Sequence, residues 1–339
     1  MYSPFPRSWL HRMGRPIAFL TQRLVPWLVA GLLLFSARTA QAEAAMPPAP
    51  AAVPATTSGA SAPETAIGSP APAYPLIMLL TDFGSRSYLL GSLKGSIYRA
   101  LPQARIDVLS NDIPKFDIDE AAQTLVLSTG DFPAGTVFVA VVDPGVGRPR
   151  TPIALETNNG QRYLAPDNGV LTQVAIRYGI KRIHEISSPM VVRAAPQEST
   201  FLSRDVLGPA AAALAQGFEL SKLGPARDSL FLLTSSPAEV REKEVQGTIS
   251  LIDGFGNAHT NIRRDQLERI GIKEGDTVEV QLGKQKLKAR LVKTYGDVPK
   301  GNPLALFGMH DEVLLAINQG SMAAAWSLQK GDPALLRRP

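Results

Sequence analysis

The sequence predicts an α/β sheet domain with helices on its faces, followed by a small all-β domain. Between about residues 74 and 235, apolar runs of strand length alternate with segments of helical periodicity, which is typical of an α/β sheet. Between about 240 and 335, short β-like runs are separated by Gly, Pro and Asn, which indicates a small barrel or sandwich. With 339 residues and 45% hydrophobic residues, the chain is long enough for two domains with substantial cores.

Each element of the α/β part follows from its own local pattern. Residues 76–80 form a continuous apolar run, which predicts a buried parallel strand. Leu89, Leu93 and Ile97 lie four apart and predict a helix over 87–101. Asp167 is expected at or near the N-cap of a later helix. Further strands are predicted at 105–110, 136–142, 152–157 and 162–167, and further helices at 117–130, 168–179 and 204–216.

The first 42 residues predict a cleaved export signal. Arginines precede an apolar run from Leu24 to Phe35, and the segment ends in the small-x-small pattern Ala40-Gln41-Ala42. The apolar run is shorter than the ~20 residues that a membrane-spanning helix needs, which favours cleavage after Ala42 over a retained anchor. The expected location is periplasmic or secreted. Residues 43–73 are rich in Pro, Ala, Ser and Thr and predict a disordered linker.

The composition excludes several classes of function. The five arginines of the signal segment account for the whole net charge of +5, so the exported remainder shows no bias toward nucleic acid. The chain has no cysteine, which excludes thiol catalysis and thiolate metal sites. Its four histidines are far apart and show no metal-ligand spacing, so neither a metal nor another cofactor is expected.

The triplet Asp82-Phe83-Gly84 matches the metal-binding triplet of protein kinases, but its context excludes that function. No His-Arg-Asp loop occurs, and the triplet lies on the first strand instead of late in the domain. Asp82 instead follows a strand at the edge where open α/β sheets bind ligands. A carboxylate there can accept hydrogen bonds from the two vicinal hydroxyls of a ribose; the alternative is a turn or helix-capping aspartate.

Five segments in order resemble the S-adenosyl-L-methionine hydroxide adenosyltransferase family, the relatives of fluorinase and chlorinase. They are residues 79–84, 141–154, 165–169, 199–205 and 252–262, and the resemblance covers about 76–330. It implies an N-terminal Rossmann-like α/β sheet domain followed by a small all-β barrel domain. It also implies homotrimers, with each nucleoside site between the first domain of one subunit and the second domain of its neighbour. The implied reaction is hydrolysis of S-adenosylmethionine to adenosine and methionine by attack of activated water on the ribose C5′.

The resemblance also assigns roles to individual residues. Asp143 and Arg150 match the pair that polarises the attacking water and holds the developing charge. For Phe116 plain core packing is the alternative to a ribose contact, and for Asn257 it is a turn. The positions expected at the substrate are Asp82 on the ribose hydroxyls, Phe116 against the ribose, Thr200, Phe201 and Ser203, Asp253 on the methionine ammonium, and Asn257 and Asn318 on adenine.

Two positions depart from the family pattern. Leu202 stands where the family hydrolases have a histidine, and loss of such an acid/base partner typically costs ~10²–10⁴ in rate. Met309 stands where the family often has a serine that grips the substrate carboxylate. An imidazole from a neighbouring subunit, His259 or His310, is one way in which the lost group could be replaced.

These departures leave three functions open. The first is an exported hydrolase that is slowed or rewired by Leu202. The second is a non-catalytic protein that binds S-adenosylmethionine or adenosine. Export also favours this second function, because S-adenosylmethionine is made and used in the cytoplasm and an exported hydrolase would rarely meet it. The last is a halide-dependent enzyme that cleaves S-adenosylmethionine, motivated by Ser203, which resembles the serine that fluorinase offers to its halide.

Overall fold

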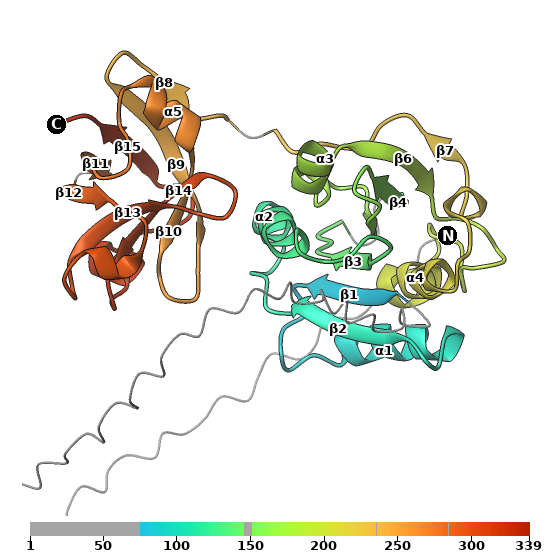
Figure 1. Ribbon diagram of the computed structural model, residues 1–339. Helices are drawn as coiled ribbons and strands as arrows, with labels where there is room; N and C mark the ends of the chain where they lie inside the picture. Colours follow the sequence, from blue (N-terminus) through green and yellow to red (C-terminus); the bar gives the residue numbers. More distant parts are fainter. Residues whose placement is uncertain (1–74, 146–150, 235, 284) are drawn as a thin grey trace, which may run out of the picture. The chain divides into compact units, whose positions relative to one another are not determined.

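The computed structural model of the protein describes residues 75–145, 151–234, 236–283 and 285–339 (Figure 1). The predicted signal at 1–42, the predicted linker at 43–73 and Arg150 lie outside these residues. Within the described ranges, no helix combines the length and the hydrophobicity needed to cross a membrane.

The first part of the chain forms a mixed, mostly parallel sheet of seven strands in the order β2-β1-β3-β5-β4-β6-β7. Strands β2, β1, β3 and β5 run parallel, whereas β4, β6 and β7 join by antiparallel pairing. The strands are β1 (Leu76–Thr81), β2 (Arg105–Ser110), β3 (Val137–Val141), β4 (Pro152–Thr157), β5 (Arg162–Pro166), β6 (Ile180–Glu185) and β7 (Ala226–Arg227).

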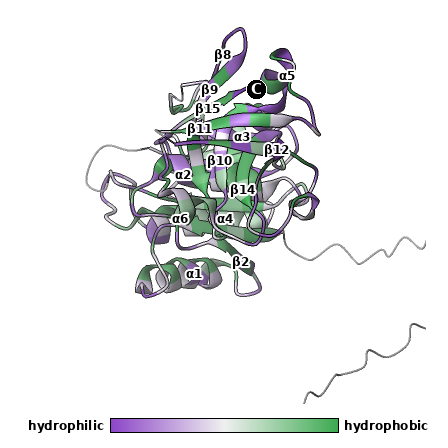
Figure 2. Cartoon of the chain, turned by 90° about the vertical axis from the view of Figure 1, so that its left-hand side faces the viewer, coloured by the Kyte–Doolittle hydropathy of each residue, from purple (hydrophilic) through white to green (hydrophobic). Residues whose placement is uncertain are grey.

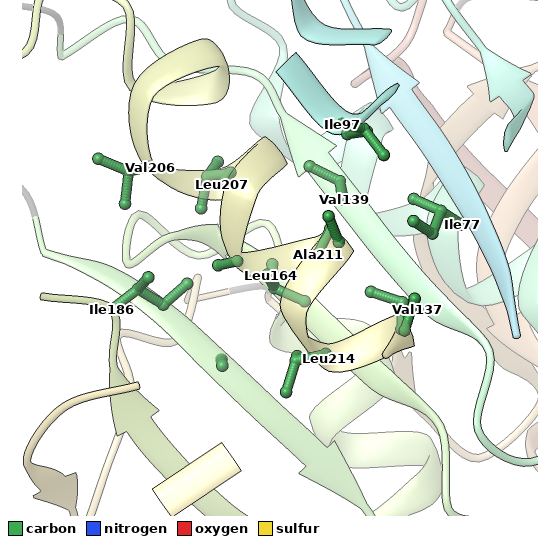
Figure 3. Packing of buried hydrophobic residues seen from close by; sticks show 14 of the residues in the cluster. Ile77, Ile97, Val137, Val139, Leu164, Ile186, Val206, Leu207, Ala211 and Leu214 are labelled. Atoms are coloured by element: carbon green, nitrogen blue, oxygen red, sulfur yellow. The ribbon is translucent and has the colours of Figure 1, made fainter. Parts of the chain in front are cut away.

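Helices cover both faces of this sheet because its central strands are apolar on both sides. On one face, α1 and α4 pack on side chains such as Ile77, Val139 and Leu164 (Figure 3). On the other face, α2 and α3 pack on Leu80 and Phe138. The predicted α/β fold is confirmed. The helices are α1 (Tyr88–Ala100), α2 (Ile118–Thr129), α3 (Thr172–Tyr178) and α4 (Gly208–Ala215), with a π-helix η1 (Ser203–Leu207) and a 3₁₀ turn η2 (Leu220–Lys222).

Two helix starts differ from the sequence prediction. Helix α3 begins at Thr172 without a side-chain cap, so the prediction of Asp167 at its N-cap is wrong. Asp167 instead accepts the Phe231 N–H at 2.7 Å and pairs with Arg227 at 3.2 Å, which ties a distant loop to the sheet. The segment predicted as one helix over 204–216 is helical without a break up to Ala215, but it starts as the π-helix η1, which runs directly into α4.

The second part of the chain is a closed β-barrel. Of the two predicted architectures, barrel and sandwich, the barrel is therefore confirmed. Seven strands follow the order β10-β14-β13-β12-β11-β15-β9, and β9 pairs again with β10 to close the ring, while β8 adds to β9. Strand β14 is coloured as largely hydrophobic in Figure 2, and it is buried along almost its whole length. The elements are β8 (Glu239–Val240), β9 (Glu244–Ile252), β10 (Ala258–Arg263), α5 (Arg264–Arg269), β11 (Thr277–Leu282), β12 (Gln285–Leu291), η3 (Tyr295–Asp297), β13 (Pro303–Phe307), β14 (Glu312–Ile317), α6 (Met322–Trp326) and β15 (Pro333–Arg337).

Candidate active site

A pocket of about 570 Å³ lies at the carboxyl ends of the central parallel strands. Strands β1 and β3 are neighbours with Thr81 opposite Val141, so Asp82 and Asp143 both leave the sheet at this edge. This is the edge at which open α/β sheets bind ligands. All lining residues belong to the α/β part: Asp82, Phe83, Tyr88, Leu89, Ser92, Lys115, Phe116, Val141, Asp143 and Thr200–Arg204.

Asp82 is held in place by the loop after β2. Its side chain is buried with 7% exposure, and Oδ2 accepts the backbone N–H of Phe116 at 3.0 Å. Its backbone carbonyl accepts a hydrogen bond from the Lys115 ammonium. One carboxylate oxygen is therefore engaged by the chain, and Oδ1 is the oxygen that a ligand hydroxyl can address.

Phe116 is an exposed aromatic on a strained backbone. Its φ of +67° lies in the left-handed region, which costs a non-glycine residue on the order of 1–3 kcal/mol. Phe116 is 65% exposed and lines the pocket, so the core-packing alternative is wrong. The hydrogen bond from the Phe116 N–H to Asp82 compensates for part of this strain. The left-handed backbone at Phe116 presents its ring to the pocket.

Asp143 is the second carboxylate of the pocket. It is half-buried, and its Oδ1 accepts the N–H of Gly145 at 3.1 Å. Asn168 belongs to the motif 165–169 but had no predicted role, and it supports this turn by donating to the carbonyl of Val142 at 2.8 Å. Arg150, the predicted partner of Asp143, is outside the described residues.

The segment 199–205 is fixed by a buried carboxylate. Asp205 accepts two hydrogen bonds from Arg204, at 2.8 and 2.7 Å, and one from the Ser199 hydroxyl at 3.1 Å. The Arg204 guanidinium holds the pKa of Asp205 below its ordinary value, although burial opposes this. Ser199 in turn accepts the Phe201 N–H at 3.2 Å, so one carboxylate orients the whole turn. The motif 199–205 was the sequence signal for this turn, although Asp205 itself had no predicted role.

Aromatic contacts join this turn to the first strand. The Phe83 and Phe201 rings meet edge to face, with centroids 6.4 Å apart. The Arg204 guanidinium lies 5.1 Å from the Phe201 ring centroid. These contacts form an apolar wall beside Asp82, where weakly hydrated ligand groups are favoured.

The side chains of Leu202 and Ser203 are both buried but differ in polarity. Leu202 is 3% exposed and belongs to the core cluster between the sheet, α1 and α4. Ser203 is 1% exposed, and its hydroxyl finds no hydrogen-bond partner among the described residues. The position where a histidine was expected is therefore apolar, and the next position carries an unsatisfied hydroxyl.

The barrel residues expected at the substrate form a turn after β9. Asp253 Oδ1 accepts the N–H groups of Phe255 and Asn257 at 2.9 Å each, and Oδ2 accepts the Asn257 side-chain amide at 2.8 Å. Asn257 thus takes part in this turn, as the alternative described, and its contact with adenine stays a prediction. Asn318 does not belong to this turn. It follows strand β14, and its side-chain amide donates to the Val298 carbonyl at 2.8 Å.

The two barrel histidines have different surroundings. His259 lies between two carboxylates, with Nδ1 3.2 Å from Glu312 and Nε2 3.8 Å from Asp253. Burial alone would raise the pKa of Glu312, but the hydrogen bonds from His259 and from backbone N–H groups outweigh it and lower the pKa. Both ring nitrogens of His310 are buried without a partner in the described part of the chain. No group of three or more metal-ligating side chains occurs in that part.

Comparison with known proteins yields one family. Residues 77–224 match the SAM hydroxide adenosyltransferase N-terminal domain, and residues 247–335 match the corresponding C-terminal domain. The chain is 32% identical to the (R)-S-adenosyl-L-methionine hydrolase of Thermus thermophilus over 266 residues, 77% of this chain and 98% of that protein. It is 30% identical to the fluorinase of Nocardia brasiliensis over 285 residues, 76% of this chain and 95% of that protein.

A solved structure agrees with this result. The crystal structure of an uncharacterized conserved protein from Thermotoga maritima superimposes with a TM-score of 0.74 at 34% sequence identity. The alignment covers 78% of this chain and 100% of that one. The similarity therefore extends over both the α/β sheet and the barrel.

Proposed function

Because the chain belongs to the S-adenosyl-L-methionine hydroxide adenosyltransferase family, we propose that it hydrolyses S-adenosylmethionine to adenosine and L-methionine. Relatives named as hydrolases of this substrate and as fluorinases support a family function of S-adenosylmethionine cleavage. The observation that carries the proposal is one pocket that holds Asp82 and Asp143 at the ends of adjacent parallel strands. The parallel part of the sheet then serves as a Rossmann-like nucleoside site.

Each carboxylate has a separate task in this proposal. Asp82, with one oxygen tied to the Phe116 N–H, accepts the ribose hydroxyls through the other. Phe116 covers the sugar, and its exposed ring is already at the pocket mouth. Asp143 orients the attacking water and accepts its proton. Arg150, which lies outside the described residues, is proposed to hold the developing charge.

The reaction favours a dry pocket. The water oxygen attacks C5′ in line with the departing sulfur, and the C5′–S bond breaks with its electron pair left on sulfur. A positive sulfonium becomes a neutral thioether, so charge is lost from the sulfur in the transition state. Apolar walls such as Val141, Phe201 and Leu202 then stabilise the transition state relative to the charged substrate.

The barrel is proposed to grip the rest of the substrate. By the family resemblance, the Asp253 carboxylate, which accepts hydrogen bonds within its own turn, is proposed to receive the methionine ammonium, while Asn257 and Asn318 are proposed to contact adenine. By the family resemblance, we propose a homotrimer with sites built from two subunits. We also propose export, with cleavage after Ala42 and contact with a membrane only through the signal segment. The proposal needs no cofactor and no nucleic acid.

One observation favours a second function, binding without turnover. Leu202 occupies the histidine position and is buried in the core, so it can neither move a proton nor orient water. A protein that binds adenosine or S-adenosylmethionine would keep Asp82 and Phe116 while losing the chemistry. A halide-dependent cleavage is the lesser alternative, motivated by Ser203.

The test is a product assay on the mature protein, residues 43–339. The protein is incubated with S-adenosylmethionine, and adenosine is followed by chromatography, with Asp143→Ala as the control. The expected result is adenosine formation that falls by about 10²–10⁴ in Asp143→Ala.

The alternatives give different results in the same assay. Tight binding of adenosine with no product above the Asp143→Ala control would replace hydrolysis by the binding function. A rate that rises with added chloride or fluoride and gives a 5′-halonucleoside would support the halide-dependent enzyme.

A further inference from the structure

Strand β10 places His259 between two carboxylates of the barrel. Its Nδ1 lies 3.2 Å from Oε1 of Glu312, at the start of β14, and its Nε2 lies 3.8 Å from Oδ2 of Asp253, just after β9. All three residues belong to the barrel, where β10 pairs with both β9 and β14. The proposed function uses Asp253 but leaves His259 and Glu312 without a task.

Glu312 is the fixed end of this arrangement. It is 5% exposed, and its second oxygen, Oε2, accepts the N–H of His310 at 3.0 Å. Gly308 makes room for the carboxylate, because a Cβ at that position would clash with Oε1. Although burial raises the pKa of Glu312, the hydrogen bonds from His259 and from backbone N–H groups lower it overall. Glu312 is therefore buried as a carboxylate and not as a carboxylic acid.

The carboxylate of Glu312 decides which nitrogen of His259 carries the proton. An ionised carboxylate only accepts hydrogen bonds, so Nδ1 of the ring must be the donor. In the neutral imidazole the other nitrogen is then an acceptor, and Nε2 presents its lone pair toward Asp253. Two acceptors therefore face each other across 3.8 Å. That distance exceeds a hydrogen bond, so both atoms are left to a donor that bridges them.

Asp253 can accept such a bridging donor without losing its own contacts. Its Oδ1 accepts the N–H groups of Phe255 and Asn257, which fix the carboxylate in its turn. Its Oδ2 accepts the Asn257 side-chain amide at 2.8 Å and has a second lone pair for a ligand. The side chains of Asp253 and His259 are 26% and 13% exposed, so a small group can reach them from solvent.

A primary ammonium is the group that best fits between these two atoms. It carries three N–H donors and no acceptor, so it can donate to Nε2 of His259 and to Oδ2 of Asp253 at once. It also supplies the positive charge that two nearby carboxylates favour. A hydroxyl brings one donor and no charge, and an anion would be repelled by Asp253 and Glu312.

We propose that His259 Nε2 and Asp253 Oδ2 together bind the α-ammonium of the substrate, with Glu312 as a positioning residue that fixes the tautomer of His259. The inference rests on the proposed function, in which Asp253 receives this ammonium, and adds to it a second acceptor. It also gives His259 a role other than replacement of the imidazole missing at Leu202. A ring held at Nδ1 by Glu312 and at Nε2 by the substrate is not free to take a proton from the attacking water.

The test begins with His259→Asn. Asparagine keeps an amide N–H near the Nδ1 position, so Glu312 keeps its donor, but it has no atom at the Nε2 position. Calorimetry at pH 8, where ordinary imidazoles are neutral, measures Kd in an Asp143→Ala background that prevents turnover. The two ligands are S-adenosylmethionine and S-adenosyl-4-methylthiobutyrate, the same molecule without its α-amine.

The expected loss is confined to the ligand that carries the amine. For His259→Asn the Kd of S-adenosylmethionine should rise about tenfold to a hundredfold, as for a lost hydrogen bond to a charged group. The Kd of the deaminated analogue should stay within about twofold of the Asp143→Ala parent. In the chain that retains Asp143, the same change should raise KM and leave kcat within about threefold.

Glu312→Gln tests the positioning role separately. A neutral amide can donate to the ring or accept from it, so it no longer fixes the tautomer, and the Kd of S-adenosylmethionine should rise about threefold to tenfold. His184→Asn is the matched control, because His184 is a partly buried ring held through Nδ1 by the Gly224 carbonyl at 3.0 Å on strand β6. It should leave both Kd values unchanged. Equal losses for both ligands in His259→Asn, with a lowered Tm, would show that the ring only supports the barrel and would overturn the inference.

Binding measured without turnover separates this inference from the proposed hydrolysis. A loss confined to the aminated ligand, in a chain whose wild type forms no adenosine, would support the ammonium site and overturn hydrolysis. Adenosine formation by the wild type, with an unchanged Kd of S-adenosylmethionine in His259→Asn and Glu312→Gln, would overturn the ammonium site alone. A wild type that neither binds nor cleaves S-adenosylmethionine would overturn both.

Discussion

Single residues at the pocket carry conformational strain and unmet hydrogen bonds that packing alone does not explain. Phe116 has a left-handed backbone and an exposed ring, and the hydroxyl of Ser203 is buried without a partner in the described residues. Both features cost stability in the free protein, and both lie in the wall of one pocket. Strain and unsatisfied groups of this kind are concentrated at functional sites.

Phe116 should contribute to ligand binding and little to stability. For Phe116→Ala we expect the Kd for adenosine to rise by about tenfold, the equivalent of an aromatic contact worth about 1–1.5 kcal/mol. The Tm should change by no more than a few degrees because the ring is 65% exposed. Calorimetric titration with adenosine measures the Kd, and Phe231→Ala, an exposed aromatic outside the pocket, is the control. An unchanged Kd in Phe116→Ala would contradict the assignment of Phe116 to the ribose.

Leu202→His should restore an imidazole at the position where the family resemblance predicts one. If the pocket hydrolyses S-adenosylmethionine, the rate of adenosine formation should rise at least tenfold, in line with the typical value of an acid/base group. The gain comes with a loss of stability, because Leu202 is buried in the core cluster and the ring must leave water. Product assays and thermal melts of the variant measure both effects. An unchanged rate in a folded variant would argue that this pocket does not handle water.

At the scale of elements, the turn 199–205 is built around one carboxylate. Asp205 holds Arg204 and Ser199, and Ser199 holds the backbone of Phe201. The turn therefore holds Thr200 and Phe201 at the pocket, and the helical segment that follows carries Leu202–Arg204.

Asp205→Asn should destabilise the protein in a pH-dependent way. At pH 7 we expect a loss of about 1–3 kcal/mol, at the lower end because Arg204 is itself largely exposed. The pKa of Asp205 is lowered by Arg204 in the folded state, so its contribution is fully present above the unfolded pKa near 3.8 and disappears as the pH falls through the folded value. Urea unfolding at pH 7 and at successive values below pH 4 should show wild type and variant converging. A constant difference down to pH 2 would exclude this ion pair as the cause.

At the scale of the whole molecule, the α/β pocket and the barrel turn supply different groups. The described pocket is lined only by residues of the α/β part, whereas Asp253 and Asn257 belong to the barrel. In the proposed trimer, a substrate held at both ends would contact the pocket of one subunit and the barrel of its neighbour.

The proposed trimer predicts that activity depends on protein concentration. Light scattering of residues 43–339 should give three times the mass of the chain, and activity per subunit should fall on dilution as the trimer dissociates. The physical reason is that separated subunits lose the neighbour's barrel groups. A fully active monomer would contradict sites shared between subunits.

Much of the fold follows from local patterns in the sequence. The elements and roles that the sequence did not predict correctly have physical causes. Buried strands such as β1 and β3 were predicted because both of their faces are apolar. Strand β6 was not predicted, because Lys181, Arg182 and His184 break any apolar pattern and antiparallel pairing with β4 holds it in the sheet. Asp167 was misassigned to a helix cap because its partners, Phe231 and Arg227, lie some sixty residues away in the chain.

The sequence by itself determined the α/β sheet, the small β domain and the order of motifs, because apolar periodicity and turn residues act over a few neighbours. It also placed Asp82 and Asp143 after strands, and it put Asp82 at the edge where open α/β sheets bind ligands. Only the tertiary structure decided that the β domain closes as a barrel, since closure depends on the pairing of β9 with β10. The burial of Leu202 and the unsatisfied hydroxyl of Ser203 were likewise decided there, because hydrogen-bond satisfaction depends on groups brought together from distant parts of the chain.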